Sequence, residues 1–281
     1  MQVGIHVSTF HRSTLEETLD AVADHGIRAV HFNMAAAGVP SMPEKISDEL
    51  CKRIAREMTA RNIVMASLSG TFNMIHPSID VRQAGLRRLA AIASRARELG
   101  TSLIALCTGT RNPDNMWHTH PDNDTPEAWD DLVATAHKAL NIAEQHHVTL
   151  GIEPEVSNVV DSAAKARRLL DEMHAPRLKI IIDGANLFHA GQLPRMNEIL
   201  DEAFDLLGDD IVLAHAKDLD RDGQAGHIPA GGGVLDYDRY LGLLDKIGYD
   251  GAVILHSLNE QDVRGCVAFL QKKLKALAKP Q

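Results

Sequence analysis

The chain is poor in cysteine. Its 281 residues include only three, Cys51, Cys107 and Cys266, which lie far apart in the sequence. A disulfide framework needs paired cysteines, and a cysteine-based zinc site needs closely spaced ones, so neither is predicted. A reducing, cytoplasmic location is the simplest expectation.

Long apolar runs and an excess of basic residues are also missing. The first residues, MQVGIHVSTFH, lack a basic segment followed by a long apolar one, and no stretch approaches about 18 uninterrupted apolar residues. We therefore expect a protein that neither enters a membrane nor is exported. The formal net charge of -9 offers no general basic field for a polyphosphate backbone, so nucleic acid is not expected as a partner.

No linker or low-complexity tract interrupts the chain, and one pattern fills it instead. Short runs rich in β-branched and other apolar residues alternate with longer amphipathic stretches, of which 195–208 is an example. The eight short runs cover residues 3–8, 27–32, 63–68, 102–107, 148–153, 178–183, 211–216 and 252–257. Each is a candidate strand, and the amphipathic stretches are candidate helices.

Strictly alternating strands and helices imply a parallel sheet. Eight strands with none left over favour closure into an α/β fold of the (β/α)8 TIM barrel type, with residues 1–281 as a single domain. The absence of GxGxxG after the first strand weakens the alternative of an open dinucleotide-binding sheet. Several helical stretches end in Gly26, Asn62, Gly100 or Gly208, where we predict left-handed caps.

In such a barrel, side chains at the carboxyl ends of the strands converge on one mouth, where the active site is built. The second run ends near His31 and Asn33, and the fifth to eighth end on Glu153, Asp183, His215 and His256. Alternation along each strand allows these last four to share the inward face. They predict a divalent-metal site for Mn²⁺, Co²⁺ or Zn²⁺, with Mg²⁺ less suitable because of the two imidazoles.

Two further features border this predicted mouth. Glu155 lies one step beyond the fifth strand, and we interpret it as a surface acid at the rim. The longest irregular stretch, residues 108–126, follows the fourth strand, and a loop of that length in a compact domain usually covers a site.

Several segments carry a family resemblance over nearly the whole chain, most specifically from about residue 148 onward. GIEPE (151–155), IIDGANL (181–187), HAKD (215–218), HIPAGGGVLDY (227–237) and ILHSL (254–258) together resemble the sugar phosphate isomerase/epimerase superfamily of xylose isomerase-like TIM barrels. That superfamily also includes ketose 3-epimerases, inosose dehydratases and endonuclease IV-type enzymes. The resemblance supports the fold strongly and the substrate weakly, because one superfamily hosts several chemistries.

The resemblance implies that Glu153, Asp183 and His215 are metal ligands, with the residue at the eighth strand as the fourth. In ketose epimerases that fourth residue is a glutamate that also moves a proton, whereas here it is His256. The shared chemistry is proton abstraction next to a carbonyl, with the enediolate stabilised by the metal. We expect Glu153 to be the base and His256 or Lys217 the opposing acid, although Lys217 has an alternative role in an ion pair with Asp218.

Other residues are candidate substrate contacts. Asn186 and His227 follow from the resemblance, and the loops after the third and fourth strands offer Asn73, His76, Arg111, Trp117, His118 and His120. Trp117 has the shape to cover the apolar face of a sugar, and Arg111 has the charge to pair with a carboxylate or phosphate.

The sequence leaves several functions open. The first is a metal-dependent isomerase or epimerase of a sugar, keto-sugar or related polyol, and the second is a lyase or dehydratase acting on a keto-sugar, keto-glycoside or inosose. An abasic-site endonuclease is disfavoured by Asn186 and by the net charge, and a non-catalytic binding barrel by the four ligand-type strand ends. The expected partner is a small sugar-like molecule, and a homo-oligomer is left open.

Overall fold

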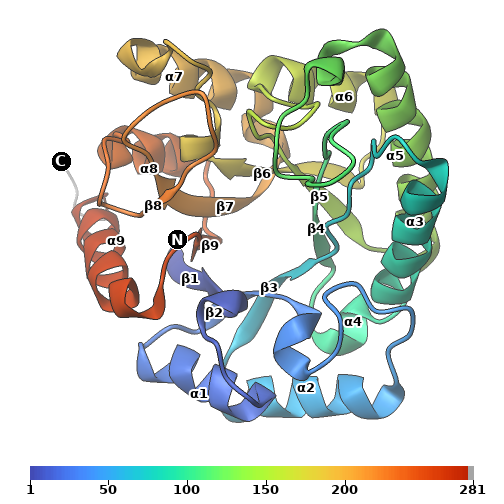
Figure 1. Cartoon of the computed structure of the whole chain (residues 1–281). Coiled ribbons are helices and arrows are strands. Elements are labelled where there is room, and N and C mark those ends of the chain that lie inside the picture. Colours follow the sequence, from blue (N-terminus) through green and yellow to red (C-terminus); the bar gives the residue numbers. More distant parts are fainter. Residues whose placement is uncertain (278–281) are drawn as a thin grey trace.

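Eight parallel strands form the wall of a closed barrel (Figure 1). The structure is a computed structural model, and it describes residues 1–277. The strands are β1 (Gln2–His6), β2 (Ala29–Phe32), β3 (Val64–Ser69), β4 (Leu103–Cys107), β5 (Thr149–Glu153), β6 (Leu178–Asp183), β7 (Ile211–Asp218) and β9 (Ala252–Leu255). They pair in this order around the wall, and β9 returns to β1. The prediction of a TIM barrel is therefore confirmed.

Helices surround this wall on the outside (Figure 1). The α-helices are α1 (Leu15–Asp24), α2 (Asp48–Ala60), α3 (Ile79–Ala93), α4 (Ala96–Leu99), α5 (Pro126–His146), α6 (Ala163–Met173), α7 (Met196–Leu207), α8 (Tyr237–Lys246) and α9 (Val263–Leu277). Short 3-10 helices occupy Val7–Thr9, Met34–Ala37, Pro121–Asp124, Gly184–Asn186, Leu193–Arg195, Gly208–Asp210 and Glu260–Asp262. None of the helices within residues 1–277 combines the length and apolarity needed to cross a membrane.

Alternate residues of each strand face opposite sides of the wall. Ile181, Leu213 and Ile254 pack together inside the barrel, whereas their strand neighbours join the larger core beneath the helices. Gly151 also faces inward, because a Cβ atom there would lie 2.7 Å from Cγ1 of Ile181. The next inward positions toward the carboxyl ends are polar, so the site rests on an apolar floor. The predicted inward face of β6 and β7 is confirmed.

The predicted helix caps are confirmed at three positions and wrong at one. Gly26, Asn62 and Gly100 have φ values of 74°, 53° and 103°, in the left-handed region. Gly208 instead has φ of -51° and opens a 3-10 turn. That turn continues the right-handed winding of α7 directly into β7, so no left-handed residue is required there.

A short additional strand, β8 (Ile228–Pro229), was not predicted. It pairs antiparallel with the end of β7, outside the barrel wall. The Asp218 carboxylate orders this segment, since it accepts hydrogen bonds from the backbone N–H groups of Gly231 and Leu235 at 3.0 and 2.9 Å. Gly233 is required beside it, because a Cβ atom there would lie 2.4 Å from Oδ1 of Asp218.

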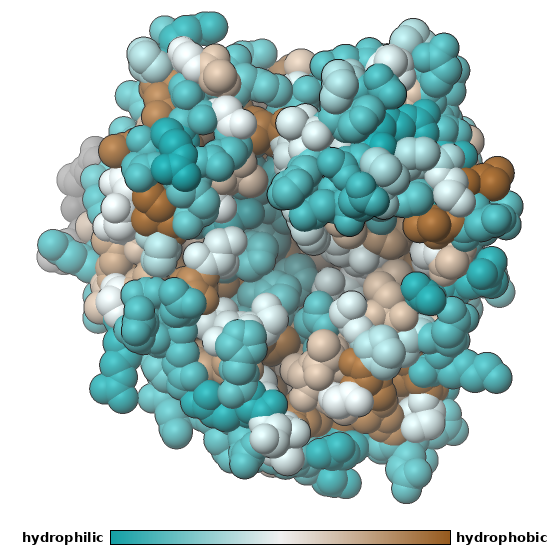
Figure 2. All heavy atoms as spheres, in the orientation of Figure 1, coloured by the Kyte–Doolittle hydropathy of each residue, from teal (hydrophilic) through white to brown (hydrophobic). Residues whose placement is uncertain are grey.

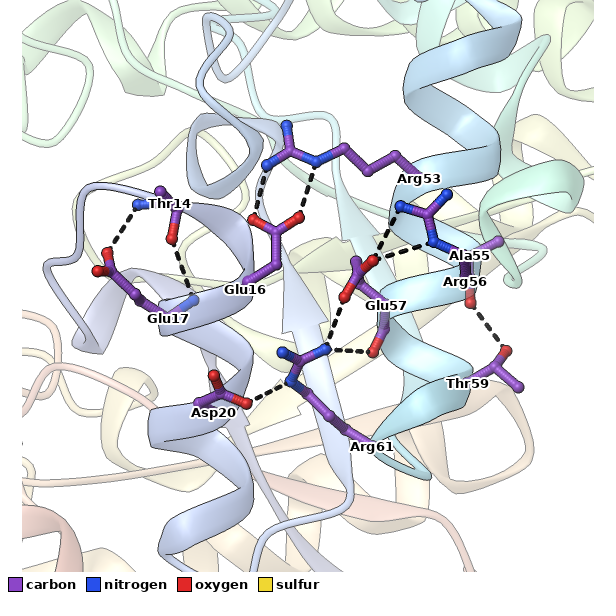
Figure 3. A network of polar contacts seen from close by, with 10 residues as sticks. All are labelled: Thr14, Glu16, Glu17, Asp20, Arg53, Ala55, Arg56, Glu57, Thr59 and Arg61. Carbon is purple, nitrogen blue, oxygen red and sulfur yellow. Dashed lines mark hydrogen bonds and ion pairs between the residues drawn. The ribbon is translucent and has the colours of Figure 1, made fainter.

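Helices α1 and α2 are joined on the outer surface by a network of ion pairs (Figure 3). Arg53 contacts Glu16 at 2.6 Å, and Arg61, which follows α2, bridges Asp20 of α1 and Glu57 of α2 at 2.6 and 2.9 Å. The hydrogen bonds from Arg53 lower the pKa of Glu16 to about 2. Ion pairs at a protein surface contribute little stability each.

Candidate active site

Glu153, Asp183 and His215 meet at the carboxyl ends of β5, β6 and β7. Each offers one ligand atom, and these three atoms all lie within 4.8 Å of one another. Nδ1 of His215 is 3.2 Å from Oε2 of Glu153, and pairing of β6 with β7 sets Asp183 directly beside His215. Of the four strand ends that the sequence analysis expects to form one site, these three lie together, and we call them the triad.

Two atoms of the triad are buried without a hydrogen-bond partner. These are Oδ2 of Asp183 and Nδ1 of His215. Each makes an ion-pair contact only: Nδ1 of His215 lies 3.2 Å from Oε2 of Glu153, and Oδ2 of Asp183 lies 3.5 Å from Nζ of Lys217. Buried polar atoms in native proteins normally have hydrogen-bond partners as well. One divalent cation between them would satisfy both, and carboxylate and imidazole are suitable donors for it. The residues present therefore fit a divalent metal.

Lys217 extends from β7 between the two carboxylates. Its Nζ atom is 3.5 Å from Oε1 of Glu153 and 3.5 Å from Oδ2 of Asp183. Burial disfavours the charged ammonium, yet the neighbouring carboxylates more than offset this and raise the pKa of Lys217 overall. The lysine thus stays protonated inside the site. The alternative pairing of Lys217 with Asp218 is not what the structure has.

Glu153 is held by an amide as well as by these charges. Nδ2 of Asn186 donates to Oε1 of Glu153 at 2.8 Å, and the Gly226 N–H donates to Oδ1 of Asn186 at 3.0 Å. Burial favours the protonated carboxyl, but His215 and Lys217 outweigh it and lower the pKa of Glu153 to about 2. Glu153 is thereby fixed as a carboxylate. Asn186, expected to contact substrate, is fully buried and orients Glu153.

Two tyrosines of α8 hold the backbone beneath the triad. The Tyr240 hydroxyl lies 3.1 Å from the carbonyl oxygen of Ile182 and 2.9 Å from that of His215. The Tyr237 hydroxyl donates to the carbonyl oxygen of Lys217 at 2.7 Å. Both side chains are buried, so the ends of β6 and β7 are anchored from the helical layer.

The Tyr240→Phe variant is expected to lose about 1–2 kcal/mol of unfolding free energy. The ring would still fill its place, but two buried carbonyl groups would lose their shared hydroxyl donor. Urea denaturation followed by circular dichroism measures this. A loss below about 0.5 kcal/mol would show that the hydroxyl does not support the strand ends.

His256 lies beside the triad but not within it. It follows β9, and its ring centroid is 5.6 Å from that of His215. Its ring nitrogens do not belong to the set of ligand atoms that lie within 4.8 Å of one another. Its Nδ1 atom is buried without a hydrogen-bond partner, and burial, with Lys217 as the next largest cause, lowers the pKa of the imidazole. His256 is therefore a neutral imidazole facing the triad from the next strand.

A cavity of about 370 Å³ opens above these residues. In space-filling view this face is hollowed near its centre, and hydrophilic side chains lie deep in the hollow (Figure 2). The lining comprises His6, His31, Asn33, Ser41, Ser69, Thr71, Ala105, Leu106, Cys107, Met116, Trp117, Glu153, Glu155, His215, Lys217 and His256. Trp117 comes from the long 108–126 loop and is 53% exposed, so this loop borders the cavity as expected.

Glu155 differs from the surface acid that the sequence suggested. It lines the cavity and is only 7% exposed. Its Oε1 atom accepts hydrogen bonds from Oγ of Ser157 and from Nδ2 of Asn158. Burial raises the pKa of this carboxyl. Interpretation of Glu155 as a solvated rim acid is therefore wrong, because the following turn folds over it.

The remaining candidate contacts do not line the cavity. Asn73, His76, Arg111, His118, His120 and His227 are instead occupied by contacts within the chain. Arg111, for example, pairs with Asp131 of α5 at 2.7 Å and donates to the carbonyl oxygen of Ile75. His227 contacts Oδ1 of Asp220 at 2.9 Å. We leave these six residues out of the proposed binding site.

Sequence reasoning missed His6, Ser69, Thr71 and Cys107, which also line the cavity. His6 ends β1 as Glu153 ends β5, so the rule that identified the triad applies to GIHVS without change. Ser69 and Cys107 end β3 and β4. A serine hydroxyl and a single cysteine without closely spaced partners gave no indication of a site in the sequence, so only their place at a strand end marks them.

Comparison with solved structures gives matches along the whole chain. A D-tagatose 3-epimerase-like protein has a TM-score of 0.77 at 16% identity, over 99% of this chain and 98% of that one. The probable 3-DHS dehydratase AsbF from Bacillus anthracis has a TM-score of 0.74 at 15% identity, over 96% and 99%. The IOLI protein, solved with a binding zinc atom, has a TM-score of 0.75 at 15% identity, over 100% of both chains. At these identities the likeness establishes the fold alone.

Curated protein sequences give no match. The family model described as xylose isomerase-like TIM barrel matches residues 19–273, which is most of the chain. The chain therefore belongs to the xylose isomerase-like TIM barrel family.

Proposed function

We propose that this protein is a divalent-metal-dependent isomerase or epimerase of a sugar, keto-sugar or related polyol. The observation that supports this best is the triad of Glu153, Asp183 and His215, of which Glu153 and His215 line one cavity together with His256, the residue that follows β9. Going around the barrel from β5 to β9, the carboxylate of Glu153 and the imidazole of His256 flank the other two residues. Glu153 and His256, which can each take a proton from the substrate or give one to it, therefore lie on either side of the candidate metal position.

The proposed chemistry is proton transfer at a carbon next to a carbonyl. When bound to Glu153, Asp183 and His215, a divalent ion would supply Lewis acidity toward the substrate oxygens. Glu153, kept as a carboxylate by His215 and Lys217 and oriented by Asn186, is the proposed base that removes the proton. The Lys217 ammonium lines the cavity 3.5 Å from Oε1 of Glu153, and its proposed role is to stabilise the negative charge that develops on the substrate. His256 is the proposed acid that returns a proton to the substrate from the side opposite Glu153, and Lys217 is the alternative acid. His256 is also the proposed fourth metal ligand.

The charges around the cavity favour an uncharged substrate. Among the described residues that line it, Lys217 is the one lysine or arginine, and both of its carboxylate neighbours are 3.5 Å away. No lysine or arginine of the lining is thus left over to bind a phosphate or carboxylate. Trp117 at the mouth has the flat surface that covers the apolar face of a sugar ring. A neutral sugar or glycoside suits these features better than a sugar phosphate does.

A lyase or dehydratase remains the second candidate. It shares proton abstraction next to a carbonyl and differs in the loss of a leaving group in the next step. The protonated Lys217 inside the cavity supports it, because an ammonium group can donate a proton to a departing oxygen. The metal is proposed to be Mn²⁺, Co²⁺ or Zn²⁺, and a related fold binds zinc.

Hydrogen exchange in D₂O tests this function directly. The purified protein, treated with a chelator and reloaded with Mn²⁺, Co²⁺ or Zn²⁺, is incubated with ketoses, keto-glycosides and inososes, and with phosphorylated or carboxylated counterparts. We expect deuterium to enter next to the carbonyl of a neutral member, and chelation to lower the rate by more than about 100-fold. Mass spectrometry and NMR measure the exchange.

The products separate the two candidates. An epimer or isomer of unchanged mass indicates isomerisation, whereas loss of water or of an aglycone indicates a lyase. Equal exchange in chelated and reloaded protein would contradict the role of the metal. Exchange confined to the anionic compounds would contradict the proposed neutral substrate class.

A further inference from the structure

Four imidazoles stand side by side at the carboxyl ends of adjoining strands. His31 lies in β2, His6 ends β1, His256 follows β9 and His215 lies in β7. The ring centroids are 4.5 Å apart for His6 and His31, 5.0 Å for His6 and His256, and 5.4 Å for His31 and His215. Of these four residues, His215 belongs to the triad and the other three do not.

The two ring nitrogens of His215 face different neighbours. Nδ1 is 3.2 Å from Oε2 of Glu153, on the side of the triad. Nε2 is 3.4 Å from Nδ1 of His31, in a fully buried contact. A histidine that binds a metal through one ring nitrogen normally donates the hydrogen on the other nitrogen to a fixed acceptor, which sets its tautomer and orientation. In this protein the residue at that place is His31.

We propose that His31 is a positioning residue for the metal ligand His215. Its Nδ1 atom accepts a hydrogen bond from Nε2–H of His215, which leaves the lone pair of His215 Nδ1 free and directed at the metal position beside Glu153 and Asp183. The inference rests on the proposed metal site. It assigns to an imidazole the place that a carboxylate, backbone carbonyl or water more often takes.

This arrangement fixes the hydrogen positions on both rings. A nitrogen that binds a metal must be unprotonated, so His215 carries its hydrogen on Nε2. His31 is then unprotonated at Nδ1, and as a neutral ring it carries its hydrogen on Nε2, a buried atom that has no hydrogen-bond partner among the described residues.

The ring of His31 is itself held in place. His31 is 4% exposed and packs against the ring of His6. His6 in turn accepts a hydrogen bond at Nδ1 from the Ser8 N–H at 3.2 Å, and Oγ of Ser8 is 2.6 Å from the same atom. Nδ1 of His31 is therefore already held in position beside His215 before metal binds.

Two variants of similar shape separate a hydrogen bond from simple packing. Asn at position 31 keeps an acceptor oxygen where His31 has Nδ1, whereas Leu has the same branching and no polar atom. We expect His31→Leu to weaken Mn²⁺ or Co²⁺ binding by about 10–100-fold, and His31→Asn to bind at least about 5-fold more tightly than His31→Leu. Isothermal titration calorimetry on the metal-free proteins measures both.

Controls keep the outcome interpretable. His25→Asn removes a histidine at the end of α1, where its Nδ1 is 2.8 Å from the carbonyl oxygen of Ala21, and should bind metal like the wild type. Thermal unfolding of each metal-free protein verifies that it is folded. The visible spectrum of bound Co²⁺ should keep the same band pattern in His31→Asn, because the atoms that bind the metal are unchanged.

Three results would overturn the proposal. Equal affinity of folded His31→Leu and His31→Asn would exclude the hydrogen bond, and so would wild-type affinity in His31→Leu. A Co²⁺ spectrum in His31→Asn that shows one fewer nitrogen ligand would make His31 a metal ligand itself. If the wild type binds none of these metals, both the proposed function and the role of His31 fail. If Asp183→Asn loses metal binding while both His31 variants keep the wild-type affinity, the metal site stands and only the role of His31 is refuted.

Discussion

The Asp183→Asn variant should bind Mn²⁺, Co²⁺ or Zn²⁺ at least about 100-fold more weakly than the wild type, with exchange activity lost in parallel. Asp183 is fully buried, and its Oδ2 atom has no hydrogen-bond partner. Asparagine nearly matches it in shape and can still accept from the Ala185 N–H, as Oδ1 of Asp183 does at 3.0 Å. It lacks the negative charge, however, and its amide nitrogen cannot bind a cation. Calorimetric titration of the metal-free protein measures the loss.

Asp210→Asn is the matched control for this change. Asp210 precedes β7, at the opposite end of that strand from the triad, and its carboxylate pairs with Lys179 at 2.6 Å and with Arg167 at 2.9 Å. The same chemical change there should leave metal affinity within about 3-fold of the wild type. Equal affinities in Asp183→Asn and the wild type would remove Asp183 from the metal site.

The Glu153→Gln variant should lower the rate of metal-dependent deuterium exchange by about 10²–10⁴-fold at saturating metal. Glutamine keeps the size of the side chain but cannot accept the substrate proton as a base. Saturation with metal, established by titration, separates this loss from weaker metal binding. Solvent exchange into the substrate, followed by NMR, gives the rate.

Glu155→Gln provides the comparison. Both glutamates line the same cavity and lie on either side of Pro154, but only Glu153 belongs to the triad. We expect Glu155→Gln to lower the exchange rate by less than about 10-fold. A larger loss in Glu155→Gln than in Glu153→Gln would transfer the role of base to Glu155.

The barrel and the triad could be predicted because both depend on local periodicity. Strands that alternate with helices close in only a few ways, and a period of two residues decides which side chains face inward. Leu213 and Ile181 lie inside the barrel, so His215 and Asp183, two residues further along, face inward at its mouth. No long-range information was needed for this step.

The contacts around the triad depend on chain segments that are distant in sequence. Asn186 faces Glu153 across 33 positions, and Arg111 is captured by Asp131 of α5. Glu155 is buried because the next residues turn back, with the Glu155 N–H donating to the carbonyl oxygen of Val160 at 3.1 Å. Residue type alone cannot separate a polar group that meets substrate from one that meets another side chain.

His256 marks the limit of the strand-end rule. β9 ends at Leu255, and the chain then turns through Ser257, which has φ of 55° in the left-handed region. The imidazole is therefore set by a bend rather than by the regular strand. Parity places it on the inward side, but the bend decides its distance from the triad.

A crystal structure of the protein soaked in Mn²⁺, with anomalous diffraction data, tests the central claim most directly. We predict one strong anomalous peak, about 2.0–2.5 Å from a carboxylate oxygen of Glu153, a carboxylate oxygen of Asp183 and Nδ1 of His215. A fully soaked crystal with no peak between these residues, or with Mn²⁺ bound only elsewhere, would contradict it.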